Sequence, residues 1–158
     1  MPVVLYRVDE RLIHGQVVIG WGHELRPNRY VVVDDEIAAS AWEQELYVLG
    51  APEADTVFAT VDEARAELEA WCSAPVRTVV LTRTIRSMRA LLEGQGPGYA
   101  INLGGLHAGP DRIRVLDYLH LTAEDRDDLT ALASEGVEVS ARDLPDAPGV
   151  GLDTILSR

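Results

Sequence analysis

Strand and helix patterns alternate along almost all of this 158-residue chain. Runs of β-branched and other apolar residues, which predict strands, occupy 2–7, 30–35, 55–60, 76–82, 99–103 and 137–141. Apolar residues at helical spacing predict helices that begin near His14, at 37–49, after Thr60, after Thr84 and from Thr122 to Ser134. Apolar strands alternating with amphipathic helices are typical of parallel sheets covered on both faces. The chain therefore predicts an α/β fold with an open, mostly parallel central sheet and helices on both faces.

Smaller signals refine this prediction. Thr60 with Glu63, and Thr122 with Asp125, have the spacing of capping boxes, which mark helix starts. The stretch 113–121 is ambiguous and predicts one or two short strands. No repeat or linker divides the chain, so we predict one domain over 1–158, with a Pro/Gly-rich tail after about residue 145 that is loosely held.

The charged residues exclude several classes of function. Fourteen basic residues stand against 26 acidic ones, for a formal net charge of −12, and all the basic residues are arginine. Such an acidic chain argues against the nucleic-acid backbone or an anionic membrane as main partner. The lack of lysine excludes a Schiff base and a Walker-type phosphate lysine. A single cysteine, Cys72, excludes an internal disulfide and a multi-thiolate metal site.

The sequence also bears on localisation. No apolar run has the roughly 18–20 residues that a membrane span requires. The apolar start of the chain is interrupted at once by the charged RVDER, which is not typical of a signal peptide. We therefore expect a cytoplasmic protein.

Polar residues follow four of the predicted strands. They are 7–14, Asp34–Asp35, Thr82–Arg83 and 102–107. In open α/β sheets, ligands bind beyond the carboxyl ends of the strands. These loops are therefore the predicted place of the functional site.

The segment RVDERLIHGQ, residues 7–16, has the residues of an anion site built around a histidine. His14 lies at a predicted helix start, where unpaired backbone N–H groups favour an anion. Gly15 leaves room for an anion on the imidazole, Arg11 can bridge phosphoryl oxygens in a fork, and Asp9 can fix the imidazole tautomer. A plainer interpretation stays open, in which His14 only caps the helix and the charged residues pair at the surface.

The other histidines do not predict a metal site. His14 and His23 are nine residues apart, unlike the i, i+4 pairs that share a helix face. His107 and His120 have no carboxylate or thiolate at a useful spacing. We expect no metal and no other cofactor.

Two further motifs have structural interpretations. Asp34–Asp35 is similar to the acidic pair of a phospho-accepting receiver domain, but such a site also requires a lysine, and this chain has none. A role of these acids at a solvated strand end or as a helix cap is therefore favoured. The Gly-rich NLGGLH, residues 102–107, matches neither GxGxxG nor GxxxxGK. It predicts a backbone turn that passes close to a neighbouring loop.

The string RVDERLIHGQVVIGW closely resembles the first segment of the IIB components of the mannose/fructose/sorbose family of the bacterial phosphotransferase system (PTS). The resemblance continues, in order, through YVVVDDEIAAS, YAINLGGLH and LTAEDRDDLTALASEGVEVSARDLPD. These segments span most of residues 3–146. One departure is Glu10, which stands where the family often has Asp, at a position that we predict to be peripheral to the site.

The resemblance implies an α/β domain whose first strand–helix loop carries a phosphohistidine, normally modified at Nδ1. The implied phosphoryl donor is a histidine of the IIA component, and the implied acceptor is a sugar bound by the membrane pair IIC/IID, where the chain would lie peripherally at the inner membrane. His14 would be the phosphocarrier, Arg11 would bind the phosphoryl group, and Asp9 would orient the imidazole. Gly15 and Gln16 would supply backbone N–H groups.

Several points stay open at this stage. A regulatory phosphocarrier, whose phosphorylation is sensed by another protein without sugar transport, would use the same loop. Arg7 is taken as a further phosphoryl-binding residue, with pairing to Asp34 or Asp35 as the alternative. The sequence does not predict the sugar, the oligomeric state, or the roles of Arg83, Asp34 and His107.

Overall fold

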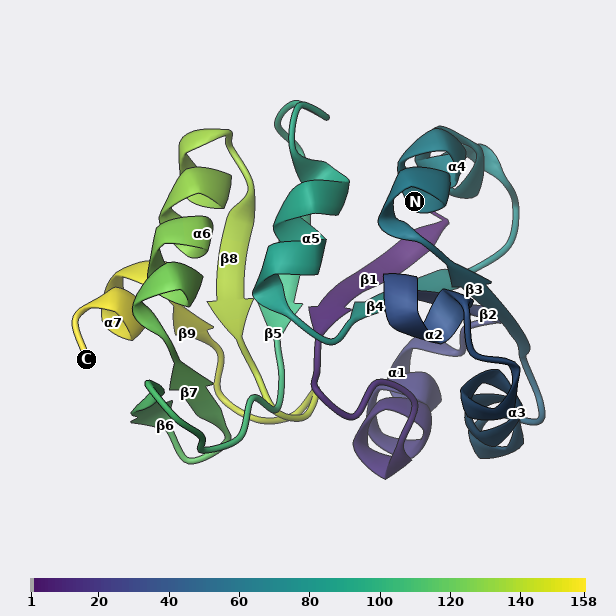
Figure 1. The fold of residues 1–158 in the computed structure, drawn as a ribbon, viewed down its shortest axis with the longest axis horizontal. Coiled ribbons are helices and arrows are strands. Elements are labelled where there is room, and N and C mark those ends of the chain that lie inside the picture. Colours follow the sequence, from purple (N-terminus) through teal and green to yellow (C-terminus); the bar gives the residue numbers. More distant parts are fainter. Residues whose placement is uncertain (1) are drawn as a thin grey trace.

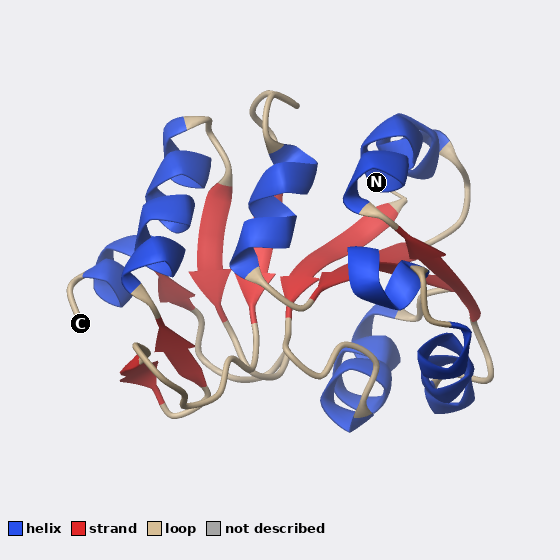
Figure 2. Ribbon diagram, viewed as in Figure 1, coloured by secondary structure: helices blue, strands red, loops and turns tan. Residues whose placement is uncertain are grey.

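The computed structural model describes residues 2–158 and has a seven-stranded sheet at its centre (Figures 1 and 2). The strand order is β3-β2-β4-β1-β5-β8-β9. The strands are β1 (Val3–Val8), β2 (Arg29–Val33), β3 (Asp55–Ala59), β4 (Thr78–Thr82), β5 (Ala100–Leu103), β8 (Glu138–Ala141) and β9 (Val150–Gly151). The hydrogen-bonded strand pairs of this sheet are parallel, except for the antiparallel pair of β8 with β9. The predicted open, mostly parallel sheet is confirmed.

Helices cover both faces of the sheet (Figure 1). On one face lie α4 (Val61–Ser73), α5 (Ile85–Leu92) and α6 (Ala123–Ser134), and on the other lie the π-helical turn η1 (Gln16–Trp21), α1 (Gly22–Leu25) and α3 (Ala41–Gly50). The short helices α2 (Asp35–Ala38) and α7 (Leu152–Leu156) complete the set within the described residues.

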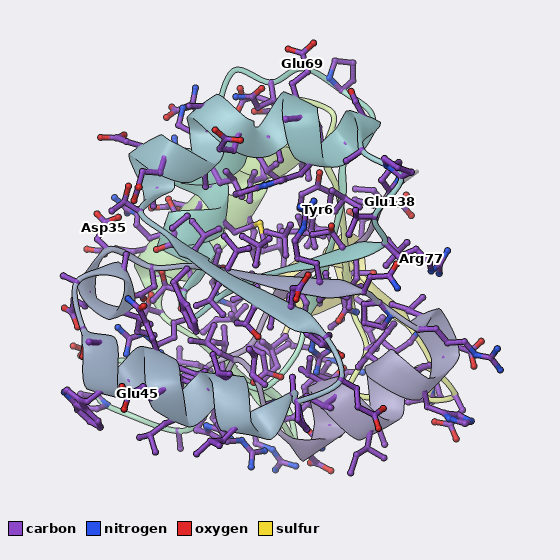
Figure 3. The ribbon with its side chains drawn as sticks, turned by 90° about the vertical axis from the view of Figure 1, so that its right-hand side faces the viewer. Tyr6, Asp35, Glu45, Glu69, Arg77 and Glu138 are labelled. Atoms are coloured by element: carbon purple, nitrogen blue, oxygen red, sulfur yellow. The ribbon has the colours of Figure 1, made fainter. Side chains whose placement is uncertain are left out.

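The two faces are separate parts of the core because side chains alternate along a strand. Val31 and Val33 of β2 pack with α4 and α5, whereas Val32, between them, packs with the residues under η1 and α3. All three side chains are fully buried or nearly so. Tyr6 of β1 lies between the layers in Figure 3, with its hydroxyl 3.4 Å from Cys72 Sγ. The hydrophobic runs of the strands therefore supply both halves of the core.

The predicted helix starts are confirmed at atomic level. The Thr60 side chain accepts a hydrogen bond from Glu63 N, and the Glu63 carboxylate accepts one from Thr60 N. Thr122 and Asp125 form the same reciprocal pair at the start of α6. Each pair satisfies backbone donors that a helix start leaves open.

The segment 37–49 differs from the predicted single helix. Asp34 accepts a hydrogen bond from Ile37 N and so starts α2 two residues earlier than predicted. The chain then becomes extended at Ser40 before α3 begins at Ala41. The predicted helix is therefore two helices, because a local side-chain cap competes with continuous helical spacing.

The region 113–121 forms two strands, β6 (Ile113–Leu116) and β7 (Leu119–Leu121), which make an antiparallel hairpin apart from the main sheet. The tail after residue 145 is also ordered into elements. Its β9 pairs with β8, and Ile155 of α7 is fully buried in the core. The prediction of a loosely held tail does not fit these contacts. It rested on the Pro/Gly content of the tail, which does not reveal the pairing of β9 or the burial of Ile155.

β1 lies between β4 and β5, so the ends of these three strands are neighbours. The pairing of β1 with β5 is confined to the carboxyl ends, where Arg7 faces Asn102 and Val8 faces Leu103. The loop that follows β1 therefore emerges between two other strand ends. Separately, none of the helices in residues 2–158 is long and apolar enough to cross a membrane.

Candidate functional site

The loop after β1 is tied to both neighbouring strand ends by backbone hydrogen bonds. Asp9 N donates to Thr82 O at 3.0 Å, and Glu10 N donates to Gly105 O at 2.9 Å. Gly104 N donates to Val8 O at 2.8 Å. The prediction that the Gly-rich turn passes close to a neighbouring loop is confirmed. These bonds hold the backbone of the loop against two strands, and the fixed backbone orients the side chains of the loop.

Leu12 gives the loop a sharp reversal. Its φ is 56°, a left-handed conformation that costs a leucine on the order of 1–3 kcal/mol. Its N–H donates to Asp9 O at 3.0 Å and its side chain is fully buried, so hydrogen bonding and packing maintain the turn. The reversal brings His14 back toward Asp9.

Asp9 and His14 form the centre of the site. The Asp9 side chain is fully buried, and its Oδ1 lies 3.1 Å from His14 Nε2 and accepts a hydrogen bond from Arg11 N, also at 3.1 Å. The His14 N–H is not aligned well enough on that oxygen for a regular hydrogen bond, but the distance marks a direct polar contact. A carboxylate next to Nε2 favours the proton on that nitrogen and leaves the lone pair on Nδ1.

The start of the helix follows directly. His14 O accepts the N–H groups of Val17 and Val18 at 3.0 and 2.9 Å. A Cβ at Gly15 would meet nothing within 4 Å, so the space beside the Gly15 backbone is open. The Gln16 side chain contacts Asp143 Oδ2 at 3.4 Å. The roles of the Gly15 and Gln16 backbone N–H groups stay predictions.

Arg7 is a buried structural residue of the site. Its side chain is fully buried, and its five N–H groups are directed to the Asp9 carboxylate, Asn102 Oδ1, and the backbone oxygens of Arg142 and Asp143. The predicted pairing with Asp34 or Asp35 is wrong. The burial also argues against the predicted contact with a phosphoryl group. We infer that Arg7 holds Asp9 in place, because Asp9 Oδ2 accepts from it at 3.0 Å.

Replacing Arg7 by Met is expected to destabilise the fold by about 3–5 kcal/mol, since it leaves the buried Asp9 carboxylate without its counter-charge. The free energy of unfolding in urea measures this effect. The matched control is Arg114→Met, which removes an ion pair to Asp117 between two exposed side chains and should cost at most about 1 kcal/mol. Equal losses in the two variants would contradict the structural role of Arg7.

Arg11 differs from Arg7. It is exposed, and its guanidinium forms no hydrogen bond or ion pair with any residue from 2 to 158. Its backbone N–H anchors it to Asp9, the same carboxylate that contacts His14. Arg11 is therefore the cation of this loop that remains available to an incoming anion.

A second cluster lies beside the loop, and sequence reasoning missed it in part. Glu10 accepts from His107 Nδ1 at 2.6 Å and from Arg112 Nη1 at 2.5 Å. Glu10 is thus not peripheral, since it joins the loop to the turn after β5. Arg112 was not identified because it is 102 residues away in sequence and no motif surrounds it. The sequence predicts no role for the neighbouring histidine, His107.

Arg83 and Asp34 pair with each other on the side of β4. The Arg83 guanidinium donates to both Asp34 oxygens, at 2.9 and 3.0 Å, and to Glu36 at 3.2 Å. Asp34 also caps α2, so the favoured interpretation as a helix cap is confirmed. The structure assigns Arg83 to this ion pair.

The charges of the loop predict how stability depends on pH. Burial opposes ionisation of Asp9, but His14 and Arg7 outweigh it and hold the pKa of Asp9 below its ordinary value. The pKa of Glu10 is likewise lowered, because the bonds from Arg112 and His107 outweigh its partial burial. A carboxyl with a depressed folded-state pKa stabilises the fold above its unfolded pKa and loses that effect as the pH falls through the folded one.

We therefore expect the Asp9 and Glu10 carboxylates to make a constant contribution to the free energy of unfolding from about pH 5 upward. This contribution should be lost progressively below about pH 4.5. Urea unfolding of the wild type and Glu10→Gln between pH 3 and 7 measures it. The variant should show a smaller loss of stability on acidification. An identical pH dependence would contradict the role given to Glu10.

Comparison with known proteins defines the class to which this fold and site belong. The family described as "PTS system sorbose subfamily IIB component" matches residues 3–158. The chain belongs to this family of IIB components of the phosphotransferase system, and the resemblance seen in the sequence is confirmed.

Individual relatives are similar along most of the chain. The N-acetylgalactosamine-specific IIB component 1 of Escherichia coli K12 is 29% identical over 149 residues, covering 90% of this chain and 91% of that protein. The fructose-specific EIIB component of Bacillus subtilis is 28% identical, covering 92% and 90%. The mannose-specific EIIAB component of E. coli K12 is 27% identical, and this chain spans 49% of its length.

Solved structures share the fold. The crystal structure of manxB from Thermoanaerobacter tengcongensis has a TM-score of 0.86 and 27% identity, covering 99% of this chain and 95% of the other. The N-acetylgalactosamine-specific IIB component 1 of E. coli has a TM-score of 0.86 and 27% identity, covering 94% and 97%. The α/β architecture is therefore that of solved IIB components.

Proposed function

We propose that this chain is a phosphocarrier of sugar uptake. It accepts a phosphoryl group on Nδ1 of His14 from a phosphohistidine of the IIA component. It then passes the group to a sugar bound by the IIC/IID membrane components, at the cytoplasmic face of the membrane. The observation that carries the proposal is the 3.1 Å contact of Asp9 Oδ1 with His14 Nε2, which leaves Nδ1 as the nucleophile.

The chemistry requires little covalent machinery from the protein. The Nδ1 lone pair attacks phosphorus, a new N–P bond forms, and the N–P bond to the donor imidazole breaks, so its electron pair stays on the donor. Phosphoryl transfer of this kind depends mainly on positioning and electrostatics. Phosphohistidine has a high group-transfer potential, so the proposal requires no nucleotide or other cofactor.

Each nearby residue has a defined task in this proposal. Asp9 keeps the proton on Nε2 and stabilises the positive charge that the ring gains when Nδ1 is phosphorylated. Arg11, exposed and without a partner among residues 2–158, contacts the phosphoryl oxygens. Arg7 acts on the reaction only through Asp9.

The relatives support a sugar as the final acceptor. Relatives of this chain are named as specific for N-acetylgalactosamine, mannose, fructose or sorbose. The fusion of IIA with IIB in the mannose-specific EIIAB component supports IIA as the donor.

The proposal is tested by reconstitution. Phosphorylated IIA from the same organism, this chain, and membranes that contain IIC and IID are incubated with a panel of labelled hexoses and amino sugars. We expect sugar phosphate to form only when all components are present. Phosphorylation of this chain without any sugar phosphate would favour a regulatory phosphocarrier instead.

A further inference from the structure

Helix α3 has a large apolar face that the fold does not cover. Trp42, Leu46 and Leu49 are 65%, 58% and 77% exposed. Their spacing of four and three residues places them on one side of the helix. We call these three residues the α3 face.

This face is not needed to pack the helix. Tyr47 packs α3 against the core from the inner side of the helix. The centroid of its ring lies 6.5 Å from that of Phe58. The exposed side chains contribute little to folding because they remain in water. A cluster of exposed large apolar residues on a monomer marks an interaction surface.

The carboxyl-terminal end of α3 lies beside the loop that carries His14. A Cβ built at Gly50, the last residue of α3, would lie 3.2 Å from Ile13 Cγ2, directly before His14. η1, which follows His14, lies on the same side of the sheet as α3 (Figure 1). It presents Ile19 at 73% exposure. A partner that reaches His14 from this side can contact α3 at the same time.

The surroundings of the face are acidic. α3 carries Glu43 and Glu45, the latter labelled on the helix in Figure 3, and Glu53 follows shortly after it. The helix has no basic residue. The complementary surface is therefore apolar at its centre and basic at its rim.

We propose that the α3 face docks on the cytoplasmic surface of the IIC/IID membrane component, a proposal that rests on the function proposed above. Membrane proteins concentrate Lys and Arg in their cytoplasmic loops, which supplies the basic rim. A net charge of −12 repels anionic lipid, so membrane attachment requires contact with protein. A second copy of the chain would bring the same acidic rims together, which disfavours self-association through this face.

The test separates the two transfer steps. The triple variant Trp42→Ser, Leu46→Ser, Leu49→Ser is compared with wild type and with Ile113→Ser, which changes an exposed apolar residue (62%) on the β6–β7 hairpin. Each protein is titrated against phosphorylated IIA and, separately, against vesicles that contain IIC/IID. Co-sedimentation with those vesicles, and with empty ones, measures binding without activity.

Loss of a central interface tryptophan commonly weakens binding by about 30-fold. We expect half-maximal sugar phosphorylation and half-maximal co-sedimentation to require a concentration of the triple variant at least about 30-fold higher than that of wild type. Its phosphorylation by IIA should stay within twofold of wild type, and Ile113→Ser should match wild type in both steps. Weaker binding at high salt supports the basic rim.

Other results overturn the inference. Unchanged vesicle binding by the triple variant shows that the face is not the docking surface. An equal loss in the IIA step assigns the face to the donor, and a wild-type dimer that the variant abolishes assigns it to a second copy. If wild type itself transfers nothing to sugar while accepting phosphate from IIA, the function proposed above fails as well, and that result is visible without any variant.

Discussion

Replacement of His14 by Ala is expected to abolish phosphorylation of this chain by phosphorylated IIA. The variant lacks the Nδ1 nucleophile, and the loop after β1 contains no second histidine that could replace it. The fold should persist, because the turn depends on Leu12 and on backbone bonds rather than on the imidazole. Intact-mass spectrometry of the protein after incubation with the donor measures the gain of one phosphoryl group.

The exposed His23 offers a matched control, since His23→Gln also removes an imidazole and should accept phosphate at the wild-type rate. The wild-type adduct should be labile in acid and stable in alkali, as an N–P bond is. A phosphoryl group retained by His14→Ala, or found on an aspartate, would defeat the assignment.

Substitution of Arg11 should have the next largest effect on transfer. Negative charge spreads over three equatorial oxygens in the transition state, and a planar guanidinium contacts two of them at once. Loss of one preorganised donor costs on the order of 100–1000-fold in rate, or roughly 3–4 kcal/mol. Arg11→Gln should lie near the severe end of this range and Arg11→Lys near the mild end. Quench-flow measurement of transfer from phosphorylated IIA gives the rates.

The stability of these Arg11 variants should be unchanged, because the side chain is exposed and only its backbone N–H bonds to Asp9. This distinguishes Arg11 from Arg7. Loss of Arg7 should mainly lower the stability of the fold, whereas loss of Arg11 should mainly lower the rate of phosphoryl transfer. A wild-type rate for Arg11→Lys together with a slow, fully stable Arg7→Lys would reverse the roles of the two arginines.

The fold was predictable from sequence because its elements follow local periodicity. Each buried strand is a continuous apolar run, and two helix starts are encoded within four residues by capping boxes. The break at Ser40 was not predictable, because helical spacing continues across it and only the Asp34 cap shifts the start of α2. The packing of Ile155 was missed because the Pro/Gly content of the tail outweighed the short helical spacing of Leu152, Ile155 and Leu156.

The site was predictable where its residues are close in sequence. Asp9 and His14 are five residues apart in one loop, and the structure brings them into contact. Arg7 was misjudged because a strand-end arginine looks the same in sequence whether it faces solvent or is buried. Its acceptors at Asn102, Arg142 and Asp143 come from distant strand ends, which only the sheet order brings together.

The most direct test of the central claim is the identity of the phosphorylated nitrogen. The chain, labelled with ¹⁵N-histidine, is phosphorylated by IIA, and ³¹P–¹⁵N coupling in NMR spectra locates the new bond. The contact of Asp9 with Nε2 predicts phosphorus on Nδ1 of His14, with the proton retained on Nε2. Phosphorus on Nε2, or on any residue other than His14, would contradict the account.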